Sequence, residues 1–346
     1  MATPGTKRDS GRPTLETVAA RAGVSRSLAS LVLNNSPKVS QASRDAVRQA
    51  VADLGYRPNA AARRLAEQRS RTVGVLLNDL RQPWYADMLD GLTPVLHGAG
   101  KHILLGDGRI DRQMDDTLTW SFLDFGVDGL VLAGSIPMSE AVKSIASSIP
   151  TVAVGGRGLD LGLPHMDVLA NDNELGARLV VEHLTGLGHR RIAHISGLPS
   201  LAGQVRMQGY QDAMRAAGLE AEIRVEHGDM SEEGGYRATV ALLAGPGRPT
   251  AIFAANDLTC VGALSAATAL GVRVPEELSL AGFDNSVFAR LRALWLTSVD
   301  GTAYPMGQQA GQMLLERIAH PTAPAQTRLL PPRLEVRGST GPVPAL

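Results

Sequence analysis

One face of a short predicted helix carries side chains that can recognise a polar or anionic surface without making covalent bonds. They recur at helical spacing, and the opposite face is apolar, as expected for a helix packed on a small core. This face is made of Arg26, Ser27, Ser30, Leu31 and Asn34. A guanidinium group donates to phosphate or guanine, and hydroxyl and amide groups can pair with base edges. The pattern therefore indicates recognition chemistry.

Capping residues define the elements that must hold this face in place. The predicted helices span 15–22, 26–33 and 41–54. Thr14, Ser25 and Ser40 precede them and are favoured N-cap residues, while Gly23 and Gly55 follow two of them and readily adopt positive φ. The result is a helix, a tight turn and a second helix, closed by a third helix over a minimal core.

The charge distribution divides the chain in two. Residues 1–71 contain 13 Lys and Arg against 5 Asp and Glu, a net charge of +8, so the rest of this neutral chain carries −8. A short basic module joined to a long acidic one is typical of a polyanion-binding head on a body that does not bind polyanions.

The body alternates short β-branched runs with helical patterns, which predicts parallel sheets covered on both faces. The predicted strands are 73–77, 103–105, 130–132 and 152–154, and then, as the pattern restarts, 192–195, 252–254 and 278–280. Two similar lobes follow, with a ligand cleft between them at the strand carboxyl ends. Asn78, Asn256 and Asp257 come directly after predicted strands and could line this cleft.

We find no catalytic constellation, metal-ligand spacing or cofactor fingerprint, so we expect no enzyme activity, no metal and no cofactor. The glycine-rich run 155–158 follows a strand but matches neither the dinucleotide nor the phosphate-loop pattern. His183 and His189 flank a helix end, where a structural role is favoured. The single cysteine, Cys260, is expected to be buried. A polar N-terminus and the lack of long apolar runs predict a cytoplasmic protein with no membrane contact. The same features argue against an extracellular sugar receptor, which would need a signal peptide.

Several motifs, taken together, resemble the lactose-repressor (LacI/GalR) family over residues 14–336. The headpiece motifs lie at 14–15, 18–19, 22–25, 32–34 and 54–59, and the body motifs at 171–177, 183–184, 187–193 and 282–285. The resemblance implies a small all-α helix-turn-helix headpiece and an α/β core of two doubly wound parallel-sheet lobes, similar to periplasmic binding proteins. It also implies that the chain crosses between lobes near 171, 300 and 330.

By this resemblance the second helix lies in the DNA major groove, with Arg26 and Ser27 at base edges and Ser30 near phosphate. Leu31 departs from the family's usual arginine and would make an apolar contact. The short helix after Pro58 resembles the family's hinge helix, whose wedging leucine matches Leu65. The expected DNA contacts are Thr14, Arg26, Ser27, Ser30, Leu31, Asn34, Asn59, Ala62 and Leu65.

The resemblance also assigns an effector site in the cleft. Arg206 matches an arginine that holds an effector oxygen or carboxylate, and Asp284 matches an acid that accepts from hydroxyl or N–H groups. Trp84 and Tyr85 match a ring pair that packs on the effector, whereas Met230 stands where several relatives have an aromatic ring. The expected effector contacts are Asn78, Trp84, Tyr85, Arg206, Met230, Asn256 and Asp284. A carbohydrate or its phosphate is the first candidate, and a nucleobase or other small metabolite is the alternative.

We therefore predict a sequence-specific transcriptional regulator, a repressor, associated with the bacterial nucleoid through operator binding. A headpiece reads only half a site, so we expect a homodimer on a pseudo-palindromic double-stranded operator. The C-terminus has no heptad pattern for tetramers. The expected domains are a disordered basic arm (1–13), the headpiece (14–58), a hinge helix and linker (59–71), an effector core (72–338) and a flexible tail (339–346). Within the core, the N-lobe would hold 72–170 and 301–329, and the C-lobe 171–300 and 330–338.

Overall fold

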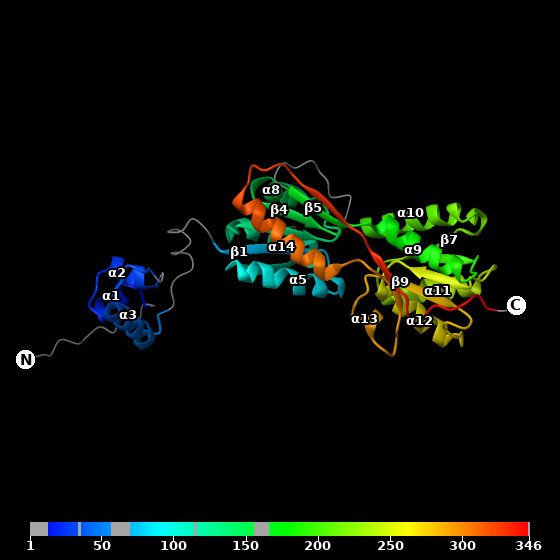
Figure 1. The fold of residues 1–346 in the computed structure, drawn as a ribbon, viewed down its shortest axis with the longest axis horizontal. Coiled ribbons are helices and arrows are strands. Elements are labelled where there is room, and N and C mark those ends of the chain that lie inside the picture. The colour runs from blue at the N-terminus through cyan, green and yellow to red at the C-terminus, as the bar shows by residue number, and fades with distance from the viewer. Residues whose placement is uncertain (1–12, 34–35, 57–69, 114–115, 156–165, 345–346) are drawn as a thin grey trace, which may run out of the picture. The chain divides into compact units, whose positions relative to one another are not determined.

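The computed structural model describes residues 13–33, 36–56, 70–113, 116–155 and 166–344. The chain forms two compact units, Met1–Ser70 and Arg71–Leu346, which are described separately (Figure 1). Residues 1–12 of the predicted basic arm (1–13) and the predicted hinge helix with Leu65 lie outside the described residues.

The described part of the first unit contains three helices with the predicted bounds, namely α1 (Leu15–Ala22), α2 (Arg26–Leu33) and α3 (Gln41–Leu54). The hydroxyl of Thr14 accepts from the backbone N–H of Thr17, and the Thr17 hydroxyl accepts in turn from the N–H of Thr14, which satisfies two donors at the start of α1. Gly23 and Gly55 end α1 and α3 with φ of 66° and 60°, where a Cβ would be strained.

A small apolar core holds these helices together. It consists of Val18, Ala19, Ala29, Val32, Val39, Val47 and Ala50. Arg21 and Asp53 join α1 to α3 through an ion pair of 3.1 Å. Because one side of α2 is buried in this core, its other side is left to solvent.

The second unit begins with an N-lobe around a six-stranded parallel sheet of order β11-β5-β4-β3-β1-β2. Its strands are β1 (Thr72–Leu77), β2 (His102–Asp107), β3 (Gly129–Ala133), β4 (Thr151–Val154), β5 (Met166–Asn171) and β11 (Thr327–Leu330). Its helices are α5 (Trp84–Gly98), α6 (Gly108–Gln113), α7 (Thr117–Asp124), α8 (Glu140–Ser148) and α14 (Ala303–Ala319).

Successive side chains of a strand point to opposite faces of the sheet, so apolar residues of the N-lobe strands lie on both faces. Val73, Val75 and Leu77 of β1 pack with α5 and α14, while Leu76 packs on the other face with α7 and α8. Helices α5 and α14 approach closely at Gly307, where a Cβ would lie 1.9 Å from the Met88 carbonyl oxygen. Figure 1 shows these two helices side by side.

The C-lobe repeats this architecture with sheet order β12-β10-β9-β8-β6-β7, in which β12 is antiparallel to β10. Its strands are β6 (Ile192–Gly197), β7 (Arg224–Gly228), β8 (Ala251–Ala254), β9 (Ser279–Phe283), β10 (Thr297–Asp300) and β12 (Arg333–Glu335). Its helices are α9 (Asn173–Gly186), α10 (Leu201–Ala216), η2 (Glu220–Glu222), α11 (Glu232–Ala244), α12 (Asp257–Ala269) and α13 (Val287–Arg290). Helices α9 and α10 cover one face, and α11 and α12 cover the other.

The chain passes between the lobes three times. The passages join β5 to α9, β10 to α14, and β11 to β12. Each lobe is therefore assembled from segments that are distant in the sequence.

The C-terminal segment differs from the predicted flexible tail. Ser339 is buried, and its hydroxyl donates to the Leu280 carbonyl and accepts from the Thr297 N–H. The Val343 N–H donates to the Leu187 carbonyl at 3.0 Å. These long-range hydrogen bonds fix residues 339–343 on the C-lobe, and composition alone gives no sign of them. None of the described helices combines the length and apolar character needed to cross a bilayer.

Candidate functional site

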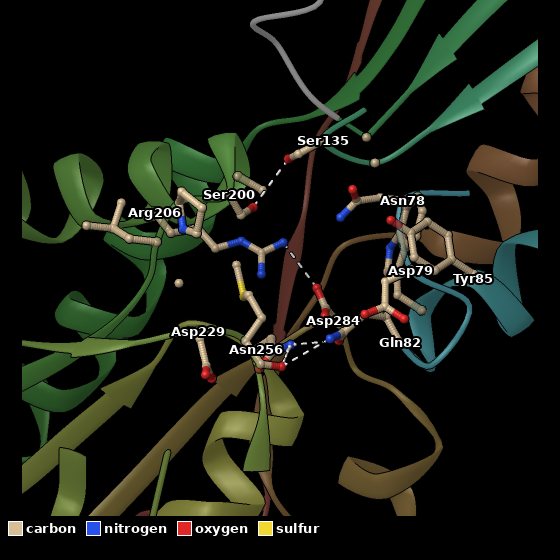
Figure 2. A pocket seen from close by; sticks show the side chains of 18 of the residues that line it. Asn78, Asp79, Gln82, Tyr85, Ser135, Ser200, Arg206, Asp229, Asn256 and Asp284 are labelled. Atoms are coloured by element: carbon tan, nitrogen blue, oxygen red, sulfur yellow. Dashed lines mark hydrogen bonds and ion pairs between the residues drawn. The ribbon is translucent and has the colours of Figure 1, made fainter. Parts of the chain in front are cut away.

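A cavity of about 510 Å³ lies between the lobes of the second unit, within the size range of ligand sites. Both lobes line it (Figure 2). The N-lobe supplies loop residues after β1, β3 and β4, and the C-lobe supplies residues after β6, β7, β8 and β9. The cavity thus lies at the carboxyl ends of parallel strands in both lobes, as the sequence predicts.

Arg206 on α10 points into the cavity from a buried position. Its guanidinium donates to the Asn173 side-chain oxygen at 2.8 Å, the Ala255 carbonyl at 2.6 Å and the Asp284 carboxylate at 3.1 Å. It also stacks 3.6 Å from the ring centre of Phe283. Burial lowers the pKa of Arg206, but a guanidinium remains charged in proteins. Five donors and one fixed plane make Arg206 a preorganised anchor.

Asp284 lies opposite Arg206 on a strained turn after β9. Asp284 and Asn285 have φ of 102° and 48°, which is uncommon for residues other than glycine. Desolvation raises the pKa of the Asp284 carboxyl, and the Arg206 guanidinium opposes that shift. The ion pair uses one carboxylate oxygen of Asp284. The second oxygen is an acceptor at the cavity, so the pair presents both a cation and an anion to a ligand.

Asp257, which we expected to line the cleft, is instead buried behind the cavity wall. Asp257 is 1% exposed and does not line the cavity. Its carboxylate accepts from the Ser286 N–H and the Ser298 hydroxyl, each at 2.6 Å. Burial raises its pKa to about 7, with a further contribution from Asp284. The prediction for Asp257 was wrong because strand-end position does not determine which way the side chain turns.

Asn256 and Met230 contact the N-lobe residue Gln82 across the cavity. The Gln82 amide nitrogen donates to the Met230 carbonyl at 3.2 Å, and the Gln82 amide oxygen accepts from Asn256 at 3.1 Å. Met230 has φ of 64°, which turns its backbone out of extended geometry. Figure 2 shows Gln82 and Asn256 facing each other.

The remaining N-lobe wall is aromatic and polar. Trp84 is half-buried at the start of α5, and its ring meets that of Tyr85 edge-to-face at 5.2 Å. Tyr85 is mostly in the N-lobe core and is 6% exposed. Asn78 follows β1 and also lines the cavity.

All seven predicted effector residues line this one cavity, namely Asn78, Trp84, Tyr85, Arg206, Met230, Asn256 and Asp284. Sequence reasoning missed six further polar lining residues, which are Asp79, Gln82, Ser135, Asn171, Ser200 and Asp229. Asn171 is the last residue of β5, and the other five lie in loops after strands or at the helix starts that follow them. Their position at or after the end of a strand was the available signal in the sequence.

The exposed face of α2 is the second candidate site. Arg26, Ser27 and Leu31 are exposed and Ser30 is half-buried, with Leu31 at 42% exposure. Arg26 lies 3.6 Å from Glu16 in a solvent-exposed ion pair, which is weak and leaves the guanidinium available. Thr14 uses its hydroxyl as the N-cap of α1. Asn34, Asn59, Ala62 and Leu65 lie outside the described residues.

The two histidines that flank the end of α9 have structural partners. His183 pairs with Thr340 at 2.9 Å, and His189 pairs with Thr250 at 2.9 Å and Ser279 at 3.0 Å. Burial lowers the pKa of both rings. Cys260 is fully buried, as predicted. Within the described ranges, no three His, Cys, Asp or Glu side chains are grouped to hold a metal ion.

Comparison with known proteins identifies the family of this chain. The model for bacterial regulatory proteins of the lacI family matches residues 14–59, and that for the periplasmic binding protein-like domain matches residues 181–340. The HTH-type transcriptional regulator CelR of Thermobifida fusca is 36% identical over 338 residues, covering 95% of this chain and 98% of CelR. This chain belongs to the lacI family. Its helix-turn-helix headpiece and its two parallel-sheet lobes are those of that family.

Two solved structures show what similar proteins bind. The lac repressor dimer bound to operator and the anti-inducer ONPF has a TM-score of 0.82 and 27% identity, covering 96% of this chain and all of that one. A complex of the regulator CelR with cellobiose has a TM-score of 0.68 and 33% identity, covering 95% of this chain and all of that one. Those relatives are thus regulators with a DNA site or a small-molecule site.

Proposed function

We propose that this lacI-family protein is a homodimeric repressor whose affinity for a pseudo-palindromic operator is controlled by a carbohydrate bound between the lobes. The carrying observation is the Arg206–Asp284 pair, which faces a cavity that Trp84 also lines. Ionised donors and acceptors suit ligand hydroxyl groups, and an indole face suits the C–H face of a sugar ring. The likeness to the CelR–cellobiose complex supports the same ligand class.

The DNA half of the proposal rests on the exposed face of α2. Arg26 and Ser27 are at its N-terminal end, where a recognition helix offers side chains to base edges. Leu31 supplies an apolar contact suited to a thymine methyl group. One headpiece reads only half of an operator, so operator binding requires two chains.

Effector control follows if the ligand prefers one arrangement of the lobes. A ligand that contacts both walls favours the arrangement in which both contacts form, and it shifts the population only by its differential affinity. In the dimer, this shift lowers the affinity for the operator.

The test is selection of bound sequences from a randomised duplex pool by the full-length protein, followed by titration of the selected duplex with cellobiose. We expect a short pseudo-palindrome to be enriched, and cellobiose or another saccharide in a panel to release it. Enrichment without release by any saccharide would overturn the carbohydrate assignment, and release by a nucleobase would replace it. No enrichment with or without metabolites would overturn the repressor assignment.

A further inference from the structure

The strained turn after β9, which carries Asp284, is held by hydrogen bonds to neighbouring elements. The Asn285 N–H donates to the Ser298 hydroxyl of β10 at 3.0 Å, and the Ser286 N–H donates to the Asp257 carboxylate of α12 at 2.6 Å. Positive φ at Asp284 and Asn285 costs free energy, so such a turn persists only where its surroundings over-determine it. The position of the Asp284 carboxylate therefore depends on these restraints.

Arg337 of the C-terminal segment adds a further restraint, which joins the two ends of the loop 285–296. Its Nη2 donates to the Asn285 side-chain oxygen at 2.6 Å, and its Nη1 donates to the Leu296 carbonyl at 2.7 Å. Its backbone N–H donates to the Thr297 hydroxyl at 2.9 Å, which fixes the start of the side chain. Because a guanidinium presents its donors as a rigid planar fork, this one side chain sets the separation of the loop ends.

Arg337 can act on the effector site only through this turn. Neither Arg337 nor Asn285 lines the cavity. Arg337 is half-buried, and within the described ranges it forms no ion pair. Instead its plane lies 5.5 Å from the Trp295 ring centre, and its donors bind an amide oxygen and a carbonyl. A half-buried charge without an anionic partner requires such bonds, so the position of the fork is specific.

We propose that Arg337 is a positioning residue of the effector site, which holds the Asp284 carboxylate opposite Arg206 by restraining the turn through Asn285. Figure 2 shows Asp284 and Arg206 facing each other. A ligand that binds both groups binds best when their separation is set in advance, and a turn without its fork can relax towards unstrained φ. The inference rests on the proposed function, because it concerns the same cavity. It makes the C-terminal segment a part of the framework of the effector site.

A double-mutant cycle tests this assignment in the full-length protein, with cellobiose as the probe and calorimetry as the readout. Arg337→Met removes the fork but keeps an unbranched stem, and Asn285→Gly removes the acceptor where glycine adopts positive φ freely. We expect each variant to weaken cellobiose binding about tenfold, and the double variant to bind no more weakly than the weaker single variant. Arg337→Lys keeps the charge but cannot span both acceptors, so it should restore part of the affinity.

Two controls separate positioning from a general loss of structure. Arg292→Met makes the same change at an exposed arginine 5.8 Å from the same Trp295 ring, and it should bind cellobiose like the wild type. Ser339→Ala removes a buried, bonded hydroxyl of the C-terminal segment, so it should lower the thermal unfolding midpoint without changing cellobiose affinity. Equal losses of affinity in Ser339→Ala and Arg337→Met would overturn the proposal. Wild-type affinity in Arg337→Met, or additive losses in the cycle, would overturn it too.

Hydrogen exchange of the free protein, measured by mass spectrometry, distinguishes failure of this inference from failure of the carbohydrate assignment. In Arg337→Met, peptides from residues 284–298 should exchange about tenfold faster, and N-lobe peptides from residues 72–107 should be unchanged, because only the loop loses a restraint. If wild-type protein does not bind cellobiose and this local change is seen, the effector class is wrong and Arg337 still holds the turn. Unchanged exchange, or faster exchange throughout the second unit, would overturn the inference.

Discussion

The two walls of the cleft are built in different ways. The C-lobe wall contains a buried, charged pair that already has protein partners, because Arg206 donates to Asn173, Ala255 and Asp284. The N-lobe wall consists of half-buried loop and helix-start residues such as Gln82 and Trp84. Buried ion pairs cost desolvation and persist only in good geometry. We therefore expect the Arg206–Asp284 pair to hold its geometry more firmly than the half-buried side chains of the N-lobe wall.

The largest effect is expected from removing the Arg206–Asp284 ion pair of the C-lobe wall. Arg206→Leu leaves Asp284 without its cation in a desolvated turn, so we expect the free energy of unfolding of the second unit to fall by about 3–5 kcal/mol. Chemical denaturation measures this, and cellobiose binding should be lost as well. Asp284→Asn is the control, because it keeps a neutral acceptor for Arg206. A stable Arg206→Leu variant would show that the wall is not held by this pair.

The pH dependence of the free energy of unfolding tests the buried carboxyl of Asp257, which lies behind the C-lobe wall. The pKa of Asp257 is about 7 in the folded protein and 3.8 by itself, so the folded state holds a proton that the unfolded state releases. Asp257 therefore contributes stability below about pH 4, and this is lost as pH rises to 7, by up to about 4 kcal/mol. Burial lowers the pKa of His194 to about 3 in the folded protein. Its effect on stability has the opposite pH dependence, because the stability contributed by the neutral ring is lost as the pH falls below 6.5.

Comparing Asp257→Asn with the wild type separates the effect of the Asp257 carboxyl from that of His194, because both proteins contain His194. We expect the urea midpoint of the variant to rise relative to wild type between pH 4.5 and 7.5, because an amide pays no ionisation penalty. A constant difference between the two proteins across that range would contradict the shifted ionisation.

Trp84→Leu tests the N-lobe wall and should have a smaller effect on stability and on cellobiose binding. Losing the indole face removes about 0.5–1.5 kcal/mol of ring packing, so we expect up to about tenfold weaker cellobiose binding. Because Trp84 is half-buried, the unfolding midpoint should change less than in Arg206→Leu. Trp84→Phe should restore part of the affinity. If Trp84→Leu destabilises the unit as much as Arg206→Leu does, the two walls are equally structural.

The smallest effect is expected at the outer edge of the lobe contact. Arg290 of the C-lobe pairs with Asp87 of the N-lobe at 3.1 Å, with side chains 47% and 24% exposed. Exposed ion pairs contribute about 0–1 kcal/mol, so Arg290→Gln should leave stability and cellobiose affinity nearly unchanged. A tenfold loss of affinity would show that this pair contributes more to the contact between the lobes than the Gln82 hydrogen bonds to Met230 and Asn256 do.

Local features of the sequence predicted the headpiece well. Thr14, Gly23 and Gly55 act within one helical turn, so the bounds of α1, α2 and α3 follow from neighbouring residues. The cleft was predicted only in part. Strand ends place Asn78 and Asn256 correctly, but the hydrogen bond between Gln82 and Asn256 joins residues 174 positions apart, and nothing local indicates it. The same limit hid the burial of Asp257 and the anchoring of Ser339.

The three passages between the lobes have a consequence for how the protein is made. The core of the N-lobe contains Met306, Ala310 and Met313 of α14, beside Val73 and Val75 of β1. A ribosome that has translated the first five strands of that lobe has not yet produced the helix that covers them. The N-lobe therefore cannot complete its core until nearly the whole chain has been synthesised, and its exposed strands need protection from aggregation until then.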